Sequence, residues 1–238
     1  MTTNPLGAPV PDWTPPPAPD LDVIGGRIVR LERLRADAHA ADLYAAYQGH
    51  HDLWDYMPIG PFLSFDDFRA WVQQAEAGRD PLLYAIVDQA SGRAVGQASF
   101  LRIAPAAGSI EVGFICFSPE LKRAPAATEA MYLMMRWAFD AGYRRYEWKC
   151  DALNRPSRRA AQRLGFSYEG IFRQAVVVKG RNRDTAWFAM IDKEWPALRL
   201  AFETWLAPEN FDAGGRQIQR LSDLTAPIRV TSDPTLAE

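Results

Sequence analysis

The sequence predicts a mixed α/β fold built on a largely antiparallel sheet, and three observations support this prediction. Segments with helical and with strand-like hydrophobic periodicity follow one another in an order that is neither a continuous βαβ alternation nor all-β. Clusters of turn-forming residues separate neighbouring strand segments by only a few residues, as in β-hairpins. With 238 residues, of which 48% are hydrophobic and 24% charged, the chain can bury a substantial core.

The predicted elements follow in chain order. A first strand covers residues 27–34, and the helix after it runs from Asp37, a residue suited to the N-cap, to about Tyr47. Ser64 with Asp67 three residues later is close to a capping box and starts a second helix. The remaining segments are strands at 82–87, 94–103 and 109–117, a helix at 125–141, a strand at 146–151, a helix at 156–164, strands at 171–178 and 185–191 around a turn at 179–184, and a last helix at 195–205.

We expect three regions along the chain. Residues 1–26 form a proline-rich arm anchored by Trp13, because proline neither continues a helix nor donates to a sheet; a surface-hugging arm is favoured over a ligand for a partner domain. Residues 27–207 form the main domain. Residues 208–238 form a loop-rich tail with a short helix near residues 217–224. Aromatic residues that look exposed and would support a homodimer are Trp13, Trp205 and Phe211.

The composition excludes several classes of protein. The formal net charge is −2, so no basic excess indicates binding to nucleic acid or to an anionic membrane. Cys116 and Cys150 are too few for a disulfide framework or a zinc site, and half-buried core positions are the simpler interpretation. The start of the chain lacks the pattern of a signal peptide, and no apolar stretch is long enough to span a bilayer. We therefore expect a soluble, cytoplasmic protein without a membrane partner.

The most informative segment runs from Lys122 to Phe166. Residues 122–130 are typical of a helix start that cradles phosphate, because the unpaired N–H groups and the positive end of the helix dipole bind anions. A strand and a second helix start at Asn154 follow, so two helix starts flank one strand and predict a site for a long, phosphate-bearing cofactor. The alternative for the first helix is a plain amphipathic helix, whose apolar stripe is Ala127, Ala130, Met131, Met134 and Ala138.

This segment resembles the GNAT superfamily of N-acetyltransferases. Lys122, Pro125 and Ala127 lie at the positions of its pyrophosphate motif, which reads Arg or Gln, two residues, Gly, one residue, then Gly or Ala. The run Ala127-Thr128-Glu129-Ala130 is similar to the Ala-Thr-Glu-Ala of the RimJ/RimL-like branch. Pro125 departs from the motif, because proline starts a helix well but supplies no N–H, which weakens the anion site without abolishing it. Arg123 would compensate as a phosphate partner.

A second pattern strengthens the resemblance. Asn154-Arg155-Pro156-Ser157, followed by Leu164-Gly165-Phe166 and Glu169-Gly170, is similar to the RimJ/RimL pattern in which the Asn side chain contacts the pantetheine arm. In the alternative interpretation, Asn154 and Ser157 only satisfy the N–H groups of the helix start. The resemblance covers about residues 27–200 and implies the GNAT fold, a twisted, mostly antiparallel sheet with splayed middle strands, flanked by helices.

The resemblance implies acetyl-CoA as the cofactor. The splay between the middle strands would leave backbone N–H groups near residues 115–117 free for the thioester oxygen. The residues expected to contact the cofactor are Ile115, Phe117, Lys122, Arg123, Ala124, Ala126, Ala127, Thr128, Asn154, Ser157 and Arg158.

Glu111 is the expected catalytic base. Acyl transfer to an amine requires a neutral amine and hydrogen-bond donors for the oxyanion. Residues 110–114 resemble the Glu-Ile-Gly-Tyr strand of the family, in which such a Glu acts as base directly or through water. Strand alternation predicts that Glu111 shares a face with Gly113 and Ile115; a solvent-facing charge is the alternative. Ser157 is the family-matched candidate for protonating or positioning the leaving sulfur.

The resemblance also implies where the acceptor amine binds. Trp54 and Tyr56 lie in the aromatic, proline-bounded segment 50–61, which shapes the acceptor site in the family; hydrophobic packing alone is an equal alternative. The segment 181–184, Arg-Asn-Arg-Asp, would meet a carboxylate or, as the favoured interpretation, form a solvated turn. No metal is expected, because none of the histidines has ligand-like partners; His39, His50 and His51 are interpreted as surface or acceptor-pocket residues.

The sequence therefore predicts an enzyme that transfers an acetyl group from acetyl-CoA to a primary amine of a protein N-terminus or a small molecule. The alternative is a non-catalytic module with a GNAT fold that holds CoA, acyl-CoA or a protein partner. Pro125, the arm and the tail support this alternative. Transfer to an aminoacyl-tRNA is disfavoured because no basic excess supports nucleic-acid binding.

Overall fold

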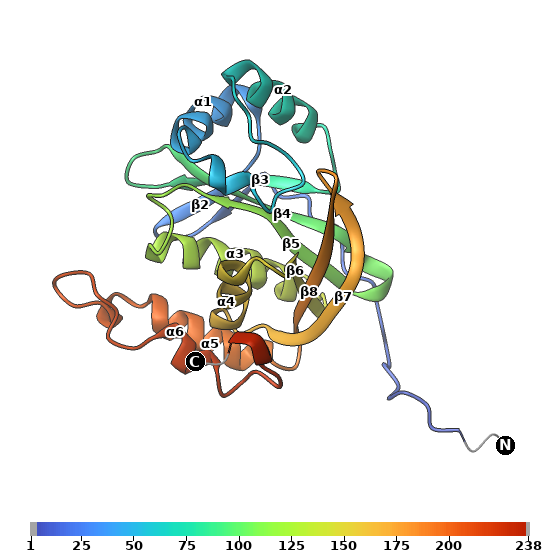
Figure 1. Cartoon of the computed structure of the whole chain (residues 1–238). Helices are drawn as coiled ribbons and strands as arrows, with labels where there is room; N and C mark the ends of the chain where they lie inside the picture. Colours follow the sequence, from blue (N-terminus) through green and yellow to red (C-terminus); the bar gives the residue numbers. More distant parts are fainter. Residues whose placement is uncertain (1–3, 237–238) are drawn as a thin grey trace.

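Eight strands form one sheet in the order β1-β2-β3-β4-β5-β6-β8-β7 in the computed structural model, which describes residues 4–236 (Figure 1). The strands are β1 Val23–Gly25, β2 Val29–Arg33, β3 Leu82–Asp88, β4 Ala94–Ala104, β5 Ser109–Phe117, β6 Arg145–Asp151, β7 Ser167–Val178 and β8 Arg181–Ile191. All neighbouring pairs are antiparallel except β5 and β6, which run parallel. The predicted mixed, mostly antiparallel architecture is confirmed.

Helices cover both faces of the sheet (Figure 1). One face carries α1 Ala36–Tyr47 and α2 Phe65–Glu76, and the other carries α3 Pro125–Asp140, α4 Arg155–Arg163, α5 Trp195–Leu206 and α6 Leu221–Thr225. Alternate residues of β3 supply both cores: Leu83 and Ala85 pack with α1 and α2, whereas Tyr84 and Ile86 pack on the α3 side. No helix within residues 4–236 is long and apolar enough to cross a bilayer.

The predicted segments differ from the observed elements at a few places, each with a local cause. The strand β1 falls inside the predicted arm, where it pairs with β2. The strand β8 begins at Arg181, earlier than predicted, because Lys179 and Gly180 alone make the turn, with φ of 48° and 73°. Asp37 does not cap α1; the ring Nδ1 of His39 accepts the N–H of the N-cap residue Arg35 instead.

The parallel strands β5 and β6 separate partway along their length. Residues 109–112 of β5 pair with residues 145–148 of β6, and the pairing ends there although both strands continue. Beyond Val112 and Trp148 the two strands diverge, so the edge of β5 that faces β6 has no strand partner. This is the splay that the family resemblance implies.

A bulge in β5 lies at the start of this divergence. Ser99 of β4 pairs with Gly113, whereas Gln97 pairs with Cys116, so β5 holds one extra residue, and Phe114 has φ of 48°. The bulge reverses the alternation of side chains along the strand. Phe114 packs on the α1 side, and Ile115 packs on the α3 side. The expectation that Ile115 shares the face of Glu111 is therefore wrong.

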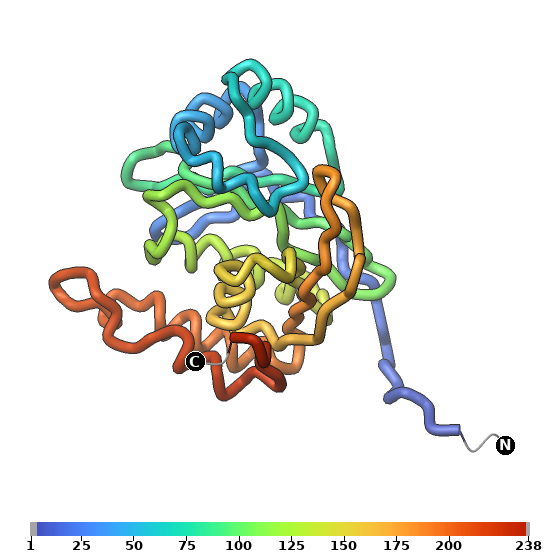
Figure 2. The backbone as a smooth tube through the Cα atoms, viewed as in Figure 1, coloured from blue at the N-terminus to red at the C-terminus, as the bar shows by residue number. Residues whose placement is uncertain are grey.

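The N-terminal arm docks on the sheet from Trp13 onward. The Trp13 ring lies against Gly108, where a Cβ would come within 2.4 Å of it, and beneath the guanidinium of Arg144. Tyr143 donates its hydroxyl to the carbonyl of Pro17 at 3.1 Å. Residues 4–12 extend away from the body of the protein (Figure 2). The anchoring role predicted for Trp13 is confirmed.

The C-terminal tail packs over α4 and α5 (Figure 2). It contains α6, which overlaps the range predicted for a short helix, and Leu221 of α6 lies in the main core. Trp205 is only 4% exposed and meets the Phe211 ring edge-on. The tail thus covers Trp205, and Trp13 packs on Gly108, so these residues give no support to a homodimer.

Glu129 of α3 ties the turn between β1 and β2 to the core. Its carboxylate accepts the backbone N–H groups of Arg27, Ile28 and Val29 at 3.0, 2.6 and 2.7 Å. We expect Glu129→Gln to lower the free energy of unfolding by about 1–3 kcal/mol, because a neutral amide accepts these bonds less well and places a donor beside them. Urea unfolding measures the change. The control Glu120→Gln, at a side chain 52% exposed, is expected to leave stability nearly unchanged.

Candidate functional site

Two helices begin beside the gap between β5 and β6. The chain leaves β5 through residues 118–124 and enters α3, and it leaves β6 through residues 152–154 and enters α4. Because both strands run in the same direction, both helices start at the end of the sheet where the strands diverge, and both lie on the same face (Figure 1). The structure therefore brings together the two helix starts that the sequence indicated.

The start of α3 is open. Its N-cap is Ala124, no side chain caps it, and Pro125 is its first residue. Lys122 and Arg123 are exposed, and within residues 4–236 neither side chain has an ion pair. Ala126 is buried and Ala127 half-buried, so this turn presents backbone and small side chains. The unpaired positive charges gather where the helix dipole is also positive.

Thr128 closes the inner side of this first turn. It is buried, and its hydroxyl accepts a hydrogen bond from Nη1 of Arg163 at 3.1 Å. The Arg163 guanidinium also lies over the Trp205 ring, and burial lowers the pKa of Arg163. Thr128 therefore connects the start of α3 to the end of α4.

At the start of α4, Asn154 is the N-cap. Its side-chain oxygen accepts the N–H of Ser157 at 3.1 Å. The Ser157 hydroxyl in turn accepts the indole N–H of Trp148 at 3.0 Å, so it lies against the part of β6 where pairing with β5 ends. The capping interpretation of Asn154 is confirmed. The Ser157 proton has no acceptor among these contacts.

Arg158 does not contribute to the gap. Its side chain is 7% exposed, and its Nε donates to Oδ2 of Asp233 in the tail at 2.7 Å. Its other nitrogens donate to the carbonyl of Ala152 and to the hydroxyl of Thr235, at 2.7 and 2.8 Å. These partners use the whole guanidinium, so Arg158 holds the tail and is not free to contact a cofactor.

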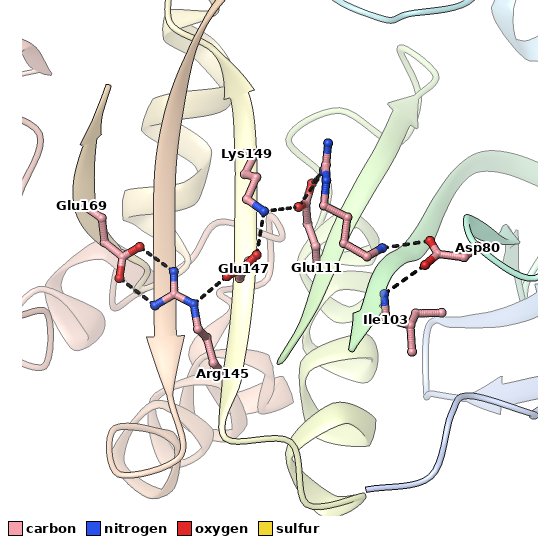
Figure 3. A network of polar contacts seen from close by, with 8 residues as sticks. Asp80, Ile103, Glu111, Arg145, Glu147, Lys149 and Glu169 are labelled. Carbon is pink, nitrogen blue, oxygen red and sulfur yellow. Dashed lines mark hydrogen bonds and ion pairs between the residues drawn. The ribbon is translucent and has the colours of Figure 1, made fainter. Parts of the chain in front are cut away.

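Glu111 lies within a line of alternating charges on the sheet (Figure 3). It is 2% exposed, so a solvent-facing charge is excluded. Both of its oxygens lie 2.7 Å from Nη1 of Arg102 on β4, and Oε2 lies 2.9 Å from Nζ of Lys149 on β6. The same ammonium lies 2.7 Å from Glu147, the residue that pairs with Glu111 in register. Further members of the line are Asp80, Arg145 and Glu169.

The two carboxylates that share Lys149 have opposite pKa shifts. Burial raises the pKa of Glu111, and the attraction of Lys149 and Arg102 only partly offsets it. Burial acts in the same direction on Glu147, but hydrogen bonds from Arg145 and Lys149 outweigh it and lower the pKa of Glu147. Of the pair, Glu111 is therefore the carboxylate that takes up a proton more readily.

The loop after α1 bridges the site. Trp54 is buried among aromatic rings, and its carbonyl accepts Nζ of Lys179 from the turn between β7 and β8 at 2.7 Å. Tyr56 is 40% exposed and donates its hydroxyl to the carbonyl of Leu153, just before α4, at 3.4 Å. Trp54 is thus a packing residue, and Tyr56 reaches across toward the start of α4. A cavity of about 180 Å³ lies on the α1 side of this loop, partly lined by His51.

Sequence reasoning missed the cations that hold Glu111. Lys149 could have been found, because Glu147 and Lys149 alternate with the buried residues Tyr146, Trp148 and Cys150 and therefore share one face of β6. Arg102 left no such signal, because its partner is known only once β4 and β5 are paired. His39 was expected at the surface or in the acceptor pocket; it is buried, and its Nε2 lies 3.0 Å from Glu32.

Comparisons with known proteins agree with this geometry. A family model described as the acetyltransferase (GNAT) domain matches residues 29–167. A GCN5-related N-acetyltransferase from Brucella melitensis has a crystal structure with a TM-score of 0.89 and 48% identity, which covers 91% of this chain and 100% of that chain. The crystal structure of a probable acetyltransferase of the GNAT family from Chromobacterium violaceum has a TM-score of 0.77 and 40% identity, and it covers 83% of this chain and 100% of that chain. The uncharacterized N-acetyltransferase p20 of Bacillus licheniformis is 24% identical over 174 residues, which cover 70% of this chain and 95% of p20.

Proposed function

Because the chain belongs to the GNAT family of acetyltransferases, we propose that it transfers the acetyl group of acetyl-CoA to a primary amine of a protein N-terminus or a small molecule. The observation that carries this proposal is the divergence of β5 and β6 beyond Val112 and Trp148, flanked by the starts of α3 and α4. The runs at 127–130 and 154–157 support a place in the RimJ/RimL-like branch.

The residues at the start of α3 fit the pyrophosphate of acetyl-CoA. The helix end carries no capping side chain, and Lys122 and Arg123 have no ion pairs within the described chain. Both features suit an anion, because the dipole and the cations act together, while the N–H groups of Ala124 and Ala127 already donate to the carbonyls of Leu121 and Ala124. Pro125 removes one N–H from this helix start. Lys122, Arg123 and the backbone of residues 124–128 would hold the phosphates, with Asn154 and Ser157 on the opposite side of the gap.

Acetyl-CoA supplies an activated acyl group in the form of a thioester. The edge of β5 beyond Val112 has no strand partner, and its backbone N–H groups near Ile115 and Phe117 would orient the thioester carbonyl. Ser157 would offer its hydroxyl proton to the sulfur by turning it from the neighbouring Cys150 thiol, while its oxygen accepts from Trp148.

Glu111 is the base in this proposal. Its raised pKa means that the carboxylate gains a proton more readily than an ordinary Glu, and Arg102 and Lys149 hold its two oxygens in a fixed orientation. The proton of the attacking amine would pass to Oε1 or Oε2, directly or through water. Tyr56, partly exposed beside the start of α4, would line the path of the amine.

The donor site has a direct test. We expect the double variant Lys122→Ala/Arg123→Ala to bind acetyl-CoA at least about 10-fold more weakly, because each charge-assisted bond to phosphate contributes about 1.5–3 kcal/mol. Isothermal titration calorimetry measures the affinity. Pro125→Gly is expected to tighten binding by restoring an N–H.

The matched control is Lys193→Ala/Arg216→Ala, which removes the same charge from exposed positions outside the gap. Unchanged affinity in the Lys122/Arg123 variant would contradict the placement of the pyrophosphate at α3. Absence of binding by the unmodified protein at millimolar acetyl-CoA would contradict the donor itself.

A further inference from the structure

Arg183 lies on β8 beside the mouth of the gap. Because side chains alternate along a strand, residues 183, 185 and 187 lie on one face of the sheet. Trp187 pairs in register with Lys149, and the Lys149 Nζ lies 3.8 Å from the centroid of the Trp187 ring. Thr185 pairs with Asp151, the last residue of β6. Arg183 therefore lies just past the end of β6, on the face that carries Lys149 and Glu111.

The guanidinium of Arg183 has no partner among residues 4–236. Arg183 is half-buried, its Nε is fully buried, and no hydrogen bond or ion pair reaches it from residues 4–236. The neighbouring Asp184 is directed elsewhere, since it accepts from the N–H of Gln174 and from Asn182. Buried donors are nearly always paired, and a buried charge without a counter-ion is costly. An arginine in this state indicates a ligand that supplies the missing acceptor.

A second unpaired donor lies on the same face. The indole Nε1 of Trp187 is buried without an acceptor, while its ring stacks on Phe172 with centroids 4.3 Å apart and an angle of 29°. Lys149, on the same face, already shares Glu111 and Glu147. Unlike Lys149, Arg183 has no carboxylate partner within residues 4–236.

The positive charge of Arg183 acts on Cys150, at the end of β6 that borders the gap. Burial raises the pKa of the Cys150 thiol to about 11, and a hydrogen bond to Ser157 and then the positive charge of Arg183 act in the opposite direction. Cys150 and Ser157 lie at the end of β6 and the start of α4, which border the gap. Arg183 is therefore close enough to this end of the gap to act on groups within it.

We propose that Arg183 binds a carboxylate of the acceptor amine, so that the enzyme prefers amines that carry an acidic group. The inference rests on the proposed function. The planar guanidinium matches a carboxylate in bidentate geometry, and it is more easily desolvated than an ammonium. Trp187 lies beneath the Lys149 ammonium that binds Glu111, and it is four residues from Arg183, about 13 Å along the strand, so the carboxylate lies several bonds from an amine near Glu111. A glutamate side chain, free or second in a peptide, has this chemistry.

Acid and amide pairs test the proposal. The probes are glutamate against glutamine, and the peptides Ser-Glu-Ala-Ala against Ser-Gln-Ala-Ala, which separate a free amino acid from a peptide N-terminus. We expect the unmodified enzyme to show a higher kcat/KM for the acidic member of at least one pair. Arg183→Gln is expected to reduce kcat/KM for that acid about 10- to 100-fold and to leave its amide unchanged. Arg181→Gln, which removes the same charge from an exposed position two residues away, is expected to keep the preference.

A binding measurement separates this inference from the proposed function. Calorimetry with the same four probes reports acid preference without turnover. If the unmodified protein prefers the acidic probes and Arg183→Gln abolishes this preference, the result supports the inference, even if no probe is acetylated. Absence of acetylation would count against the proposed function alone. Absence of acid preference in the unmodified protein, or an equal loss for acid and amide in Arg183→Gln, would overturn the inference.

Discussion

Glu111→Gln is expected to lower kcat/KM at least about 100-fold, because a positioned general base contributes about 10²–10⁴-fold to proton transfer. Glutamine keeps the shape of the side chain and can still accept from Arg102 and Lys149, but it cannot take up the proton of the amine. The unmodified enzyme is expected to lose activity on the acid side of its pH profile, as Glu111 becomes protonated. Because burial raises the pKa of Glu111, the midpoint of this limb lies above 4.5.

Glu147→Gln is the matched control for this variant. Glu147 is bound to the same Lys149 and pairs in register with Glu111, but its pKa is lowered, whereas that of Glu111 is raised. The Glu147→Gln variant is expected to keep near-normal turnover. Both Glu111→Gln and Glu147→Gln are expected to bind acetyl-CoA with the affinity of the unmodified enzyme. Full activity of Glu111→Gln across the pH range, with the acid limb intact, would exclude Glu111 as the base.

Asp233→Ala is expected to destabilise the fold by about 3–5 kcal/mol and to lower the melting temperature by roughly 6–20 °C. The Asp233 side chain is fully buried and faces Arg158, which is itself buried. Removing the carboxylate leaves the Arg158 guanidinium in the interior without a counter-ion. Thermal unfolding followed by circular dichroism measures the effect.

Two comparisons make this expectation specific. Asp223→Ala, at an exposed position of the same tail, is expected to change stability by less than about 0.5 kcal/mol. The double variant Arg158→Leu/Asp233→Leu is expected to lose less stability than Asp233→Ala, because it removes both buried charges together. A melting temperature for Asp233→Ala equal to that of Asp223→Ala would show that the tail does not depend on this ion pair.

Local signals in the sequence predicted the elements of the fold well. The strand at 109–117 and the helix that starts after Ser64 were found because hydrophobic periodicity and capping depend on neighbouring residues. The bulge at Phe114 was not found, because the extra residue is defined only by pairing with β4, although Gly113 directly before it is a local signal of irregularity. Ile115 was therefore assigned to the wrong face.

The candidate site shows the same division between local and distant contacts. Asn154 and its capped partner Ser157 lie three residues apart, and the sequence placed them correctly at a helix start. Arg158 was expected at the cofactor, but its counter-ion lies 75 residues further along the chain. Glu111 on β5 contacts Lys149 on β6 and Arg102 on β4, so its partners come from two other strands. Charges carried by separate elements become partners only through the sheet register, which single-sequence periodicity does not contain.

The bridge formed by the loop after α1 also determines how often the site is open. Its two cross-contacts are single hydrogen bonds, from Lys179 to the carbonyl of Trp54 and from Tyr56 to that of Leu153. If each contributes about 1–2 kcal/mol, breaking both costs about 2–4 kcal/mol, so roughly one molecule in thirty to one in a thousand has the bridge released at any moment. Under the proposed function, an acceptor that requires the released state would bind more weakly by this factor, whereas an amine that fits with the bridge in place would not. The bridge would thereby favour narrow acceptors.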